Sequence, residues 1–176
     1  MSDKPLISIL TINFNTADFI GLMLKTFEKL TKNSYEVLIC DNGSSKKDIL
    51  KLVKFSQQYS NVTNFFRIQS SPGSIGHGEA LDFLIQKVKT PYFVTMDADA
   101  AVFFPHWDEV LLSRINQKCK LIGTPIASHE GVKAYDFPNA YCVFYETEAF
   151  KKLNHNPVLR GYFHYTRRCF EIHLFS

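Results

Sequence analysis

Short apolar runs alternate with amphipathic stretches along most of the chain. Near-continuous apolar runs are typical of buried strands in a parallel sheet, and apolar residues that recur every three or four positions are typical of helices packed on such a sheet. Because the two patterns alternate, they predict parallel βαβ units with right-handed crossovers. The expected strands are 6–12, 35–40, 62–68, 92–96, 121–125 and 139–145, and the expected helices are 17–30, 46–59, 76–88, 107–117 and 147–153.

Individual side chains in the first two helices carry more specific expectations. Thr16 ends the turn before the first helix and is expected to cap it. Phe19 in the first helix and Leu50 in the second belong to the apolar spacing and are expected to face the sheet. Both helices should then lie on the sheet through their apolar faces.

The composition fits one globular domain. Of 176 residues, 45% are hydrophobic, which is enough for one buried core and too little for two ordinary domains. We expect an α/β fold with a mainly parallel central sheet and helices on both faces. The domain is expected to span residues 1–153. Residues 154–176, rich in aromatic and basic side chains without clear periodicity, are expected to form a tail.

Charge, cysteines and hydropathy exclude several classes of protein. A formal net charge of +3, with acidic and basic residues interspersed, gives no electrostatic footprint for nucleic acid. The four cysteines are far apart and have no zinc-ligand spacing, which favours reduced thiols. No stretch has the roughly 20 apolar residues of a membrane span, and no signal-peptide pattern opens the chain. We expect a cytoplasmic protein, and peripheral contact with the inner face of the membrane stays open.

Two carboxylates, Asp97 and Asp99, come directly after the expected strand 92–96. Open α/β sheets bind ligands at the carboxyl ends of their strands. Two neighbouring carboxylates repel each other unless a cation lies between them, and their oxygens suit Mg²⁺ or Mn²⁺, which commonly carries a diphosphate. The alternative is that both residues only end the strand and cap the next turn.

Two further strand ends carry candidate chemistry. Asp41 follows the second expected strand, so its carboxylate could accept a hydrogen bond from a base edge; alternatively, Asp41 and Asn42 form an Asx-type turn. Gly76 and His77 open the third expected helix, where exposed backbone N–H groups favour an anion such as a diphosphate. A plain helix start is the alternative there.

Four motifs in this order resemble family 2 glycosyltransferases, which have the Rossmann-like GT-A fold. The motifs are the opening strand through Asn13-Phe14-Asn15, the turn Cys40-Asp-Asn-Gly-Ser-Ser45, the segment Gly76-His-Gly-Glu-Ala-Leu81 and the sequence Met96-Asp-Ala-Asp99. The resemblance covers roughly residues 5–153. It implies the same GT-A sandwich with a mainly parallel sheet between two helical layers.

The resemblance also implies roles for individual residues. Asn13, Phe14 and Asn15 would border the nucleotide pocket, with Phe14 in place of a more usual tyrosine. Asp41 would bind the nucleobase, and Gly76 and His77 would face the diphosphate or the ribose. Asp99 would contact the cation, with Asp97 nearer the ribose or sugar. The implied reaction transfers a sugar from a nucleoside diphosphate donor to a saccharide or lipid-linked hydroxyl acceptor, with inversion and with help from Mn²⁺ or Mg²⁺.

An inverting transferase also needs a general base beside the acceptor, and the sequence departs from the family there. No Asp or Glu occurs between Asn154 and Phe170. Three explanations stay open: an altered or truncated end, a protein that binds nucleotide sugar without efficient transfer, or a base elsewhere in the chain. The weak candidates for such a base are Glu130, Asp136, Glu146 and Glu148.

A different enzyme class also places Asp-x-Asp after a strand. In haloacid-dehalogenase-like phosphatases the first aspartate attacks phosphorus and the second acts as acid and base. That class has the motif on an early strand and needs a later acidic pair. Here three βα units precede Asp97 and no Asp-Asp pair follows it, which makes this the weaker hypothesis.

Overall fold

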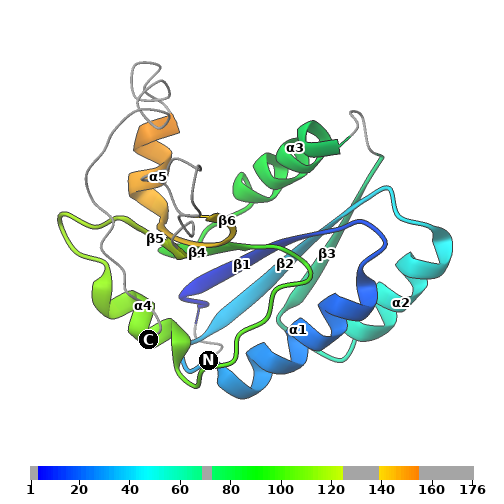
Figure 1. The fold of residues 1–176 in the computed structure, drawn as a ribbon, viewed down its shortest axis with the longest axis horizontal. Helices are drawn as coiled ribbons and strands as arrows, with labels where there is room; N and C mark the ends of the chain where they lie inside the picture. The colour runs from blue at the N-terminus through cyan, green and yellow to red at the C-terminus, as the bar shows by residue number, and fades with distance from the viewer. Residues whose placement is uncertain (1–3, 69–72, 125–138, 155–176) are drawn as a thin grey trace, which may run out of the picture.

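A computed structural model describes residues 4–68, 73–124 and 139–154 (Figure 1). Strands and helices alternate through the first four βα units, as the hydrophobic pattern predicts. The elements are β1 (Ile7–Asn13), α1 (Ala17–Leu30), β2 (Tyr35–Asn42), α2 (Lys46–Ser56), β3 (Val62–Arg67), α3 (Gly73–Ile85), β4 (Tyr92–Met96), α4 (Trp107–Arg114), β5 (Leu121–Thr124), β6 (Asn139–Glu146) and α5 (Thr147–Asn154).

The strands form one sheet in the order β3-β2-β1-β4-β6-β5. The four strands from β3 to β4 are parallel, whereas β6 runs antiparallel to β4 and β5 antiparallel to β6. The chain moves outward from β1 to β3 on one side and then crosses to β4 on the other. The carboxyl ends of β1 and β4 therefore flank the topological switch point, where open α/β sheets bind ligands.

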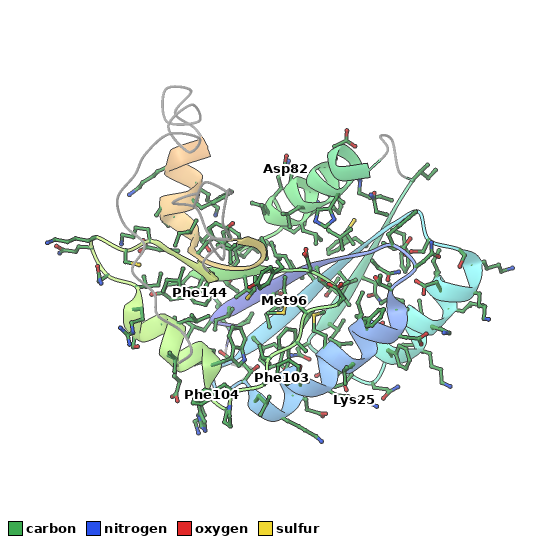
Figure 2. The ribbon with its side chains drawn as sticks, viewed as in Figure 1. Lys25, Asp82, Met96, Phe103, Phe104 and Phe144 are labelled. Carbon is green, nitrogen blue, oxygen red and sulfur yellow. The ribbon has the colours of Figure 1, made fainter. Side chains whose placement is uncertain are left out.

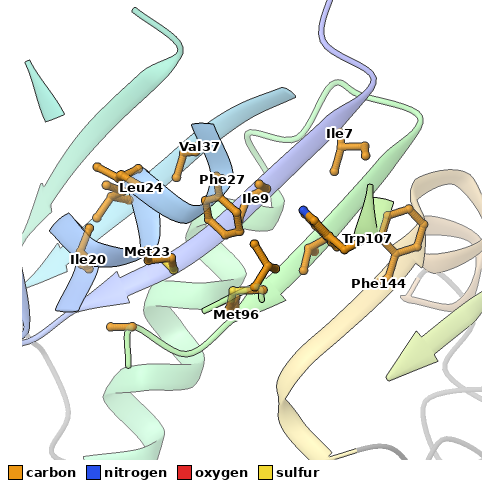
Figure 3. Close-up of a cluster of buried hydrophobic side chains, with 14 of the residues drawn as sticks. Ile7, Ile9, Ile20, Met23, Leu24, Phe27, Val37, Met96, Trp107 and Phe144 are labelled. Carbon is orange, nitrogen blue, oxygen red and sulfur yellow. The ribbon is translucent and has the colours of Figure 1, made fainter. Parts of the chain in front are cut away.

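Helices cover both faces of the sheet. On one face α1, α2 and α4 bury a cluster in which Phe27 packs against Trp107, with ring centroids 6.0 Å apart, and in which Met96 and Phe144 lie close by (Figure 3). On the other face α3 and α5 cover a second cluster that contains Phe93. Figure 1 shows α3 and α5 above the sheet and the other three helices below it. The predicted fold class, a mainly parallel sheet between helical layers, is confirmed.

Three local expectations differ from the structure. Thr16 occupies the N-cap position of α1, but its side chain does not cap the helix; the carboxylate of Asp48 in α2 accepts the Ala17 N–H instead. Phe19 and Leu50 are exposed, because the buried stripes of their helices are narrower than the apolar spacing suggests. The second and fourth helices end at Ser56 and Arg114, before the expected 59 and 117.

Two other expectations concern the chain as a whole. The division into residues 1–153 and a tail stays a prediction, because residues 155–176 lie outside the described part. Among the described residues, no helix is both long and apolar enough to cross a bilayer.

Two helical glycines provide a matched test of this packing. A Cβ added to Gly21 would lie 2.9 Å from Cδ2 of Phe55, where α1 packs on α2, whereas a Cβ on Gly78 in α3 would meet nothing within 4 Å. We expect Gly78→Ala to raise the free energy of unfolding by about 0.5–1 kcal/mol. Gly21→Ala should lower it by about 1 kcal/mol, because overpacking outweighs the gain in helix propensity. Urea unfolding of the three proteins measures both changes, and equal shifts would contradict this packing.

Candidate functional site

The polar residues that the sequence singles out meet at the carboxyl edge of the sheet. Asn13 ends β1 and pairs in register with Asp41 on β2. On the other side of β1, Leu10 pairs with Thr95 of β4, so the residues that follow β4 leave the sheet beside the end of β1. Segments that are far apart in the sequence therefore converge around the switch point.

The side-chain amide of Asn13 connects three elements. It is fully buried, and its Nδ2 lies 2.7 Å from Oδ2 of Asp41, 2.8 Å from Oδ2 of Asp48 and 3.0 Å from Oγ of Ser44. An amide has two hydrogens, so two of these three acceptors are bound at a time. Its Oδ1 accepts from the backbone N–H and the hydroxyl of Thr16. Asn13 thus ties the end of β1 to β2, to α2 and to the start of α1.

The carboxylate of Asp41 accepts hydrogen bonds from within the protein. Only 1% of the residue is exposed, and its Oδ1 accepts the backbone N–H groups of Gly43 at 3.2 Å and Ser44 at 3.1 Å. Its other oxygen accepts from Asn13. This is the Asx-type turn that the sequence left open as an alternative, with Gly43 at a positive φ of 92°. Contact between Asp41 and a nucleobase stays a prediction.

The loop after β1 is fastened to the loop after β2. Asn15, at φ 58°, donates its backbone N–H to Oγ of Ser44 at 2.9 Å, and its own Oδ1 accepts the N–H of Ser45 at the same distance. Phe14 lies between these anchors and is half exposed. The predicted pocket residues Phe14 and Asn15 therefore lie at the same edge as Asn13, and Phe14 offers an apolar surface there.

Two residues that the sequence analysis did not propose lie on the α3 side of this edge. Asn42 is buried and donates from Nδ2 to the carbonyl of Gly76 at 3.1 Å, while its Oδ1 has no partner among the described residues. Arg67 pairs with Asn42 in register, and its buried Nη1 also has no partner within that part of the chain. Its guanidinium lies 5.9 Å from the ring centroid of Phe83. Its Nη2 lies 3.7 Å from Oε2 of Glu79 in α3, so the guanidinium as a whole is ion-paired. Among the described residues, one acceptor atom and one donor atom without partners thus lie on neighbouring strands.

Strand alternation could have revealed both residues. Successive side chains of a strand point to opposite faces, so Asn42 faces α3 where Asp41 faces α2. Unpaired buried donors and acceptors are uncommon and require a partner or a ligand.

Gly76 and His77 lie in α3, which begins at Gly73 and therefore earlier than expected. Gly76 is held by Asn42 through its carbonyl. His77 is exposed and lines a cavity of about 130 Å³ between α3 and the sheet. Asp97, Thr95 and Tyr145 line the same cavity, so the predicted histidine and the first predicted aspartate share one site.

The two aspartates lie in a turn that leaves β4. The N–H of Asp97 donates to the carbonyl of Tyr141 at 2.9 Å, and the carbonyl of Asp97 accepts from Ala100 at 3.0 Å. Asp97 is half-buried and Asp99 is exposed. Burial, together with the nearby charge of Asp97, raises the pKa of the Cys142 thiol to about 12.

The donor set of this turn restricts which metal it could hold. Within the described residues, no three His, Cys, Asp or Glu side chains are grouped to hold a metal ion. Mg²⁺ keeps several water ligands and is typically held by one or two carboxylates together with substrate phosphates. Asp97 and Asp99 fit such a shared site and do not fit a cage made by the protein alone.

The candidate bases are not at this edge where the structure describes them. Glu146 pairs in register with Tyr92, at the start of β4, and its carboxylate lies 2.6 Å from Lys120. Glu148 follows in the first turn of α5 and lies 3.6 Å from Lys151. Because β6 is antiparallel to β4, the end of β6, where Glu146 lies and Glu148 follows, is at the edge of the sheet opposite Asp97. Glu130 and Asp136 lie outside the described residues.

A larger apolar cavity of about 500 Å³ lies on the α4 side of the sheet. Met96, Trp107 and Ile122 line it, and so do Phe103 and Phe104 from the loop after Asp99. Both phenylalanines are exposed, and Figure 2 shows them at the outer rim of this face. The two sides of the sheet thus differ: a small cavity with polar groups under α3 and an apolar one beside α4.

Comparison with protein families gives one match over almost the whole chain. The family model described as "Glycosyl transferase family 2" matches residues 8–174. A search of curated proteins finds no match.

Solved structures share the fold at low sequence identity. A mannosyltransferase from Pyrobaculum calidifontis, in complex with GDP-Man and Mn²⁺, is 13% identical with a TM-score of 0.65 and aligns over 86% of this chain and 47% of its own. S. aureus TarS 1–349 with UDP-GlcNAc is 12% identical with a TM-score of 0.63, and the alignment covers 84% of this chain and 47% of TarS 1–349. Glucosyl-3-phosphoglycerate synthase from Mycobacterium tuberculosis with UDP is 15% identical with a TM-score of 0.62, and the alignment covers 85% of this chain and 59% of the synthase. The chain spans about half the length of these proteins.

The cysteines test the electrostatics at the end of β4. Burial raises the pKa of Cys40 to about 11 and, with Asp97, that of Cys142 to about 12. A raised pKa keeps a thiol protonated, so at pH 8 little of Cys142 is present as the thiolate, the reactive form. We expect iodoacetamide at pH 8 to alkylate the half-buried Cys119 at least tenfold faster than Cys40 and Cys142 in the folded protein, by peptide mass spectrometry.

Unfolding in urea provides the control for this labelling. The three thiols should then react at similar rates, because burial and the nearby carboxylate no longer act on them. Rapid labelling of Cys142 in the folded protein would contradict its described surroundings.

Proposed function

Because the chain belongs to glycosyl transferase family 2 and has the GT-A fold, we propose that it binds a nucleoside diphosphate sugar and transfers the sugar to a hydroxyl acceptor with inversion. The observation that carries this proposal is the convergence of Asn13, Asn42 and Asp97 on one sheet edge at the switch point. The names of the similar structures add support, since they include GDP-Man, UDP-GlcNAc and UDP.

The nucleoside is proposed to bind over the ends of β1, β2 and β3. Asn13, Phe14 and Asn15 border the pocket, and the exposed ring of Phe14 offers a stacking surface for a base. Oδ1 of Asn42 and Nη1 of Arg67 supply an acceptor atom and a donor atom that lack partners among the described residues, while Nη2 of Arg67 pairs with Glu79. Asp41 shapes this pocket through its turn, and any contact it makes with the base uses a remaining lone pair of a carboxylate that already accepts three hydrogen bonds.

The diphosphate is proposed to lie between the first turns of α3, near Gly76, and the turn after β4. Asp99 is exposed and available as a ligand of Mn²⁺ or Mg²⁺, with Asp97 nearer the ribose or sugar. When bound, the cation would supply Lewis-acid stabilisation of the charge on the departing diphosphate. Backbone N–H groups at the start of α3 would add to that stabilisation.

The acceptor is proposed to be a saccharide or a lipid-linked hydroxyl compound. We propose a cytoplasmic location, with or without peripheral contact at the inner face of the membrane. This location agrees with the use of a nucleoside diphosphate sugar as the donor. The apolar cavity lined by Phe103 and Phe104 is one surface that could meet such a lipid.

A second candidate function is nucleotide-sugar binding without efficient transfer. The positions of Glu146 and Glu148 favour this alternative, because the end of β6 and the start of α5, which hold them, lie at the sheet edge opposite Asp97. The phosphatase hypothesis receives no support from the family match.

Calorimetry with UDP and GDP, each with and without Mn²⁺, tests donor binding. We expect at least one nucleotide to bind, with an affinity that rises in Mn²⁺. Asp99→Ala should lower the Mn²⁺-dependent affinity by about tenfold or more while leaving thermal unfolding cooperative, because it removes an exposed metal ligand. Asp82→Ala is the matched control, since Asp82 is also exposed but lies on the outer side of α3 (Figure 2).

The outcomes separate the hypotheses. If the wild-type protein binds neither nucleotide, both the transferase and the binding-domain proposals fail. If Asp99→Ala binds as well as the wild type, the metal assignment is wrong. Binding followed by no release of sugar or nucleotide from a sugar donor favours the second candidate function.

A further inference from the structure

We propose that the outer surface of α1 and α2, together with the loop before α4, docks on an anionic lipid bilayer. The starting observation is a group of exposed apolar side chains on these elements: Phe19, Leu22, Leu50, Phe103 and Phe104. Figure 1 shows α1, α2 and α4 on one side of the sheet, and Figure 2 shows Phe103, Phe104 and Lys25 along the outer border of that side. This surface is called the docking face below.

Each of the two helices adds an exposed stripe of one leucine and two lysines, spaced i, i+3, i+7 along one helix face. The stripes are Leu22, Lys25 and Lys29 in α1, and Lys47, Leu50 and Lys54 in α2. Leucine beside lysine is the pattern of helices that lie in the headgroup region of a bilayer. There the apolar side chains enter the boundary of the acyl chains and the lysines bind anionic headgroups.

The two stripes belong to one surface because the helices pack closely. A Cβ on Gly21 of α1 would lie 2.9 Å from the ring of Phe55 in α2. An ion pair between Asp18 of α1 and Lys51 of α2 joins the same two helices at the protein surface. A flat bilayer could therefore meet both stripes at once.

The docking face is basic. Together, α1 and α2 hold six lysines and three acidic residues. Asp48 is buried and bound to Asn13, and Asp18 is paired with Lys51. On these two helices this leaves five other lysines, all exposed, against one exposed carboxylate, that of Glu28. The formal net charge of the whole chain, +3, equals the excess on these two helices, so the charge of this face complements an anionic surface.

The apolar side chains favour a bilayer over a nucleic acid as the partner. Phe103 is 86% exposed and Leu50 is 62% exposed. Lysines alone bind any polyanion, and such binding depends on salt alone. Exposed phenylalanine and leucine side chains gain free energy only from a partner that removes them from water, as the apolar interior of a bilayer does.

Docking in this way would bring the proposed transferase site to the lipid surface, a consequence that rests on the function proposed above. Phe103 follows the proposed metal ligand Asp99 by four residues. Both α1 and α2 begin at the carboxyl edge of the sheet, shortly after Asn13 and Asn42. The donor would therefore bind beside the headgroups, and of the two proposed acceptor classes the lipid-linked hydroxyl compound is the one that fits.

Flotation of the full chain with lipid vesicles tests the docking face. The vesicles are phosphatidylcholine alone or with about 30% phosphatidylglycerol, at about 0.1 M salt. We expect the anionic vesicles to bind at least about tenfold more tightly, and Lys25→Gln combined with Lys54→Gln to weaken that binding about tenfold or more. The matched control is Lys89→Gln with Lys152→Gln, two exposed lysines after α3 and in α5, which should leave binding within about twofold because salt screens distant charges.

A second variant separates a bilayer from a general polyanion. Phe103→Ser keeps every charge and should weaken binding to the anionic vesicles about fivefold or more, because it removes an apolar side chain that enters the bilayer. Single-stranded DNA is the polyanion probe, and its binding should not change in Phe103→Ser. Unchanged vesicle binding by Phe103→Ser, with DNA competing for the same lysines, would make the face a polyanion site and overturn the proposal.

The remaining outcomes also decide the matter. Equal binding to neutral and anionic vesicles, or binding to neither, contradicts the docking face, and so does a Lys25 and Lys54 double variant that binds like the wild type. Nucleotide binding is measured separately. A protein that binds anionic vesicles but neither UDP nor GDP keeps the docking face and loses the proposed function, whereas one that binds a nucleotide but no vesicle loses the docking face alone.

Discussion

The buried side-chain amide of Asn13 is the interaction on which the carboxyl edge of the sheet depends. It reaches the carboxylates of Asp41 and Asp48 and the first turn of α1, so two loops and two helix starts share one anchor. A buried amide without these partners would destabilise the fold, and buried carboxylates without a donor would do so more strongly. The partners therefore hold one another in place.

This anchor explains why the two halves of the proposed site differ in character. The half around β1 and β2 is fixed by hydrogen bonds inside the protein, in which even the Asp48 carboxylate of α2 serves the Ala17 N–H of α1. The half around β4 has exposed or half-exposed carboxylates and two cavities, one on each side of the sheet. A rigid nucleotide side and a more open sugar side are what transfer between two substrates requires.

Much of the fold could be predicted from sequence because strand and helix periods are local properties of the chain. The strand Tyr92–Met96 and the helix Ala17–Leu30 agree with their expected bounds. The failures have nonlocal causes. Thr16 looks like a cap, yet Asp48 reaches α1 from a helix that is distant in sequence. Glu146 is a candidate base by sequence, but β6 pairs antiparallel with β4, so Glu146 lies at the opposite edge of the sheet. No local pattern predicts this pairing. The role of Asn42 could not be predicted either, because it depends on a contact with Gly76 in α3, which is distant in sequence.

The hydrogen bond from Asn42 to Gly76 has a consequence for how such a site could change. One side chain at the end of β2 both has an oxygen without a partner among the described residues and anchors the helix that carries His77. A substitution there would alter two properties in one step, the choice of nucleotide and the placement of the helix. Evolution or design toward a new donor would therefore have to begin elsewhere, for instance at Phe14, or be followed by a second change in α3 that restores its position.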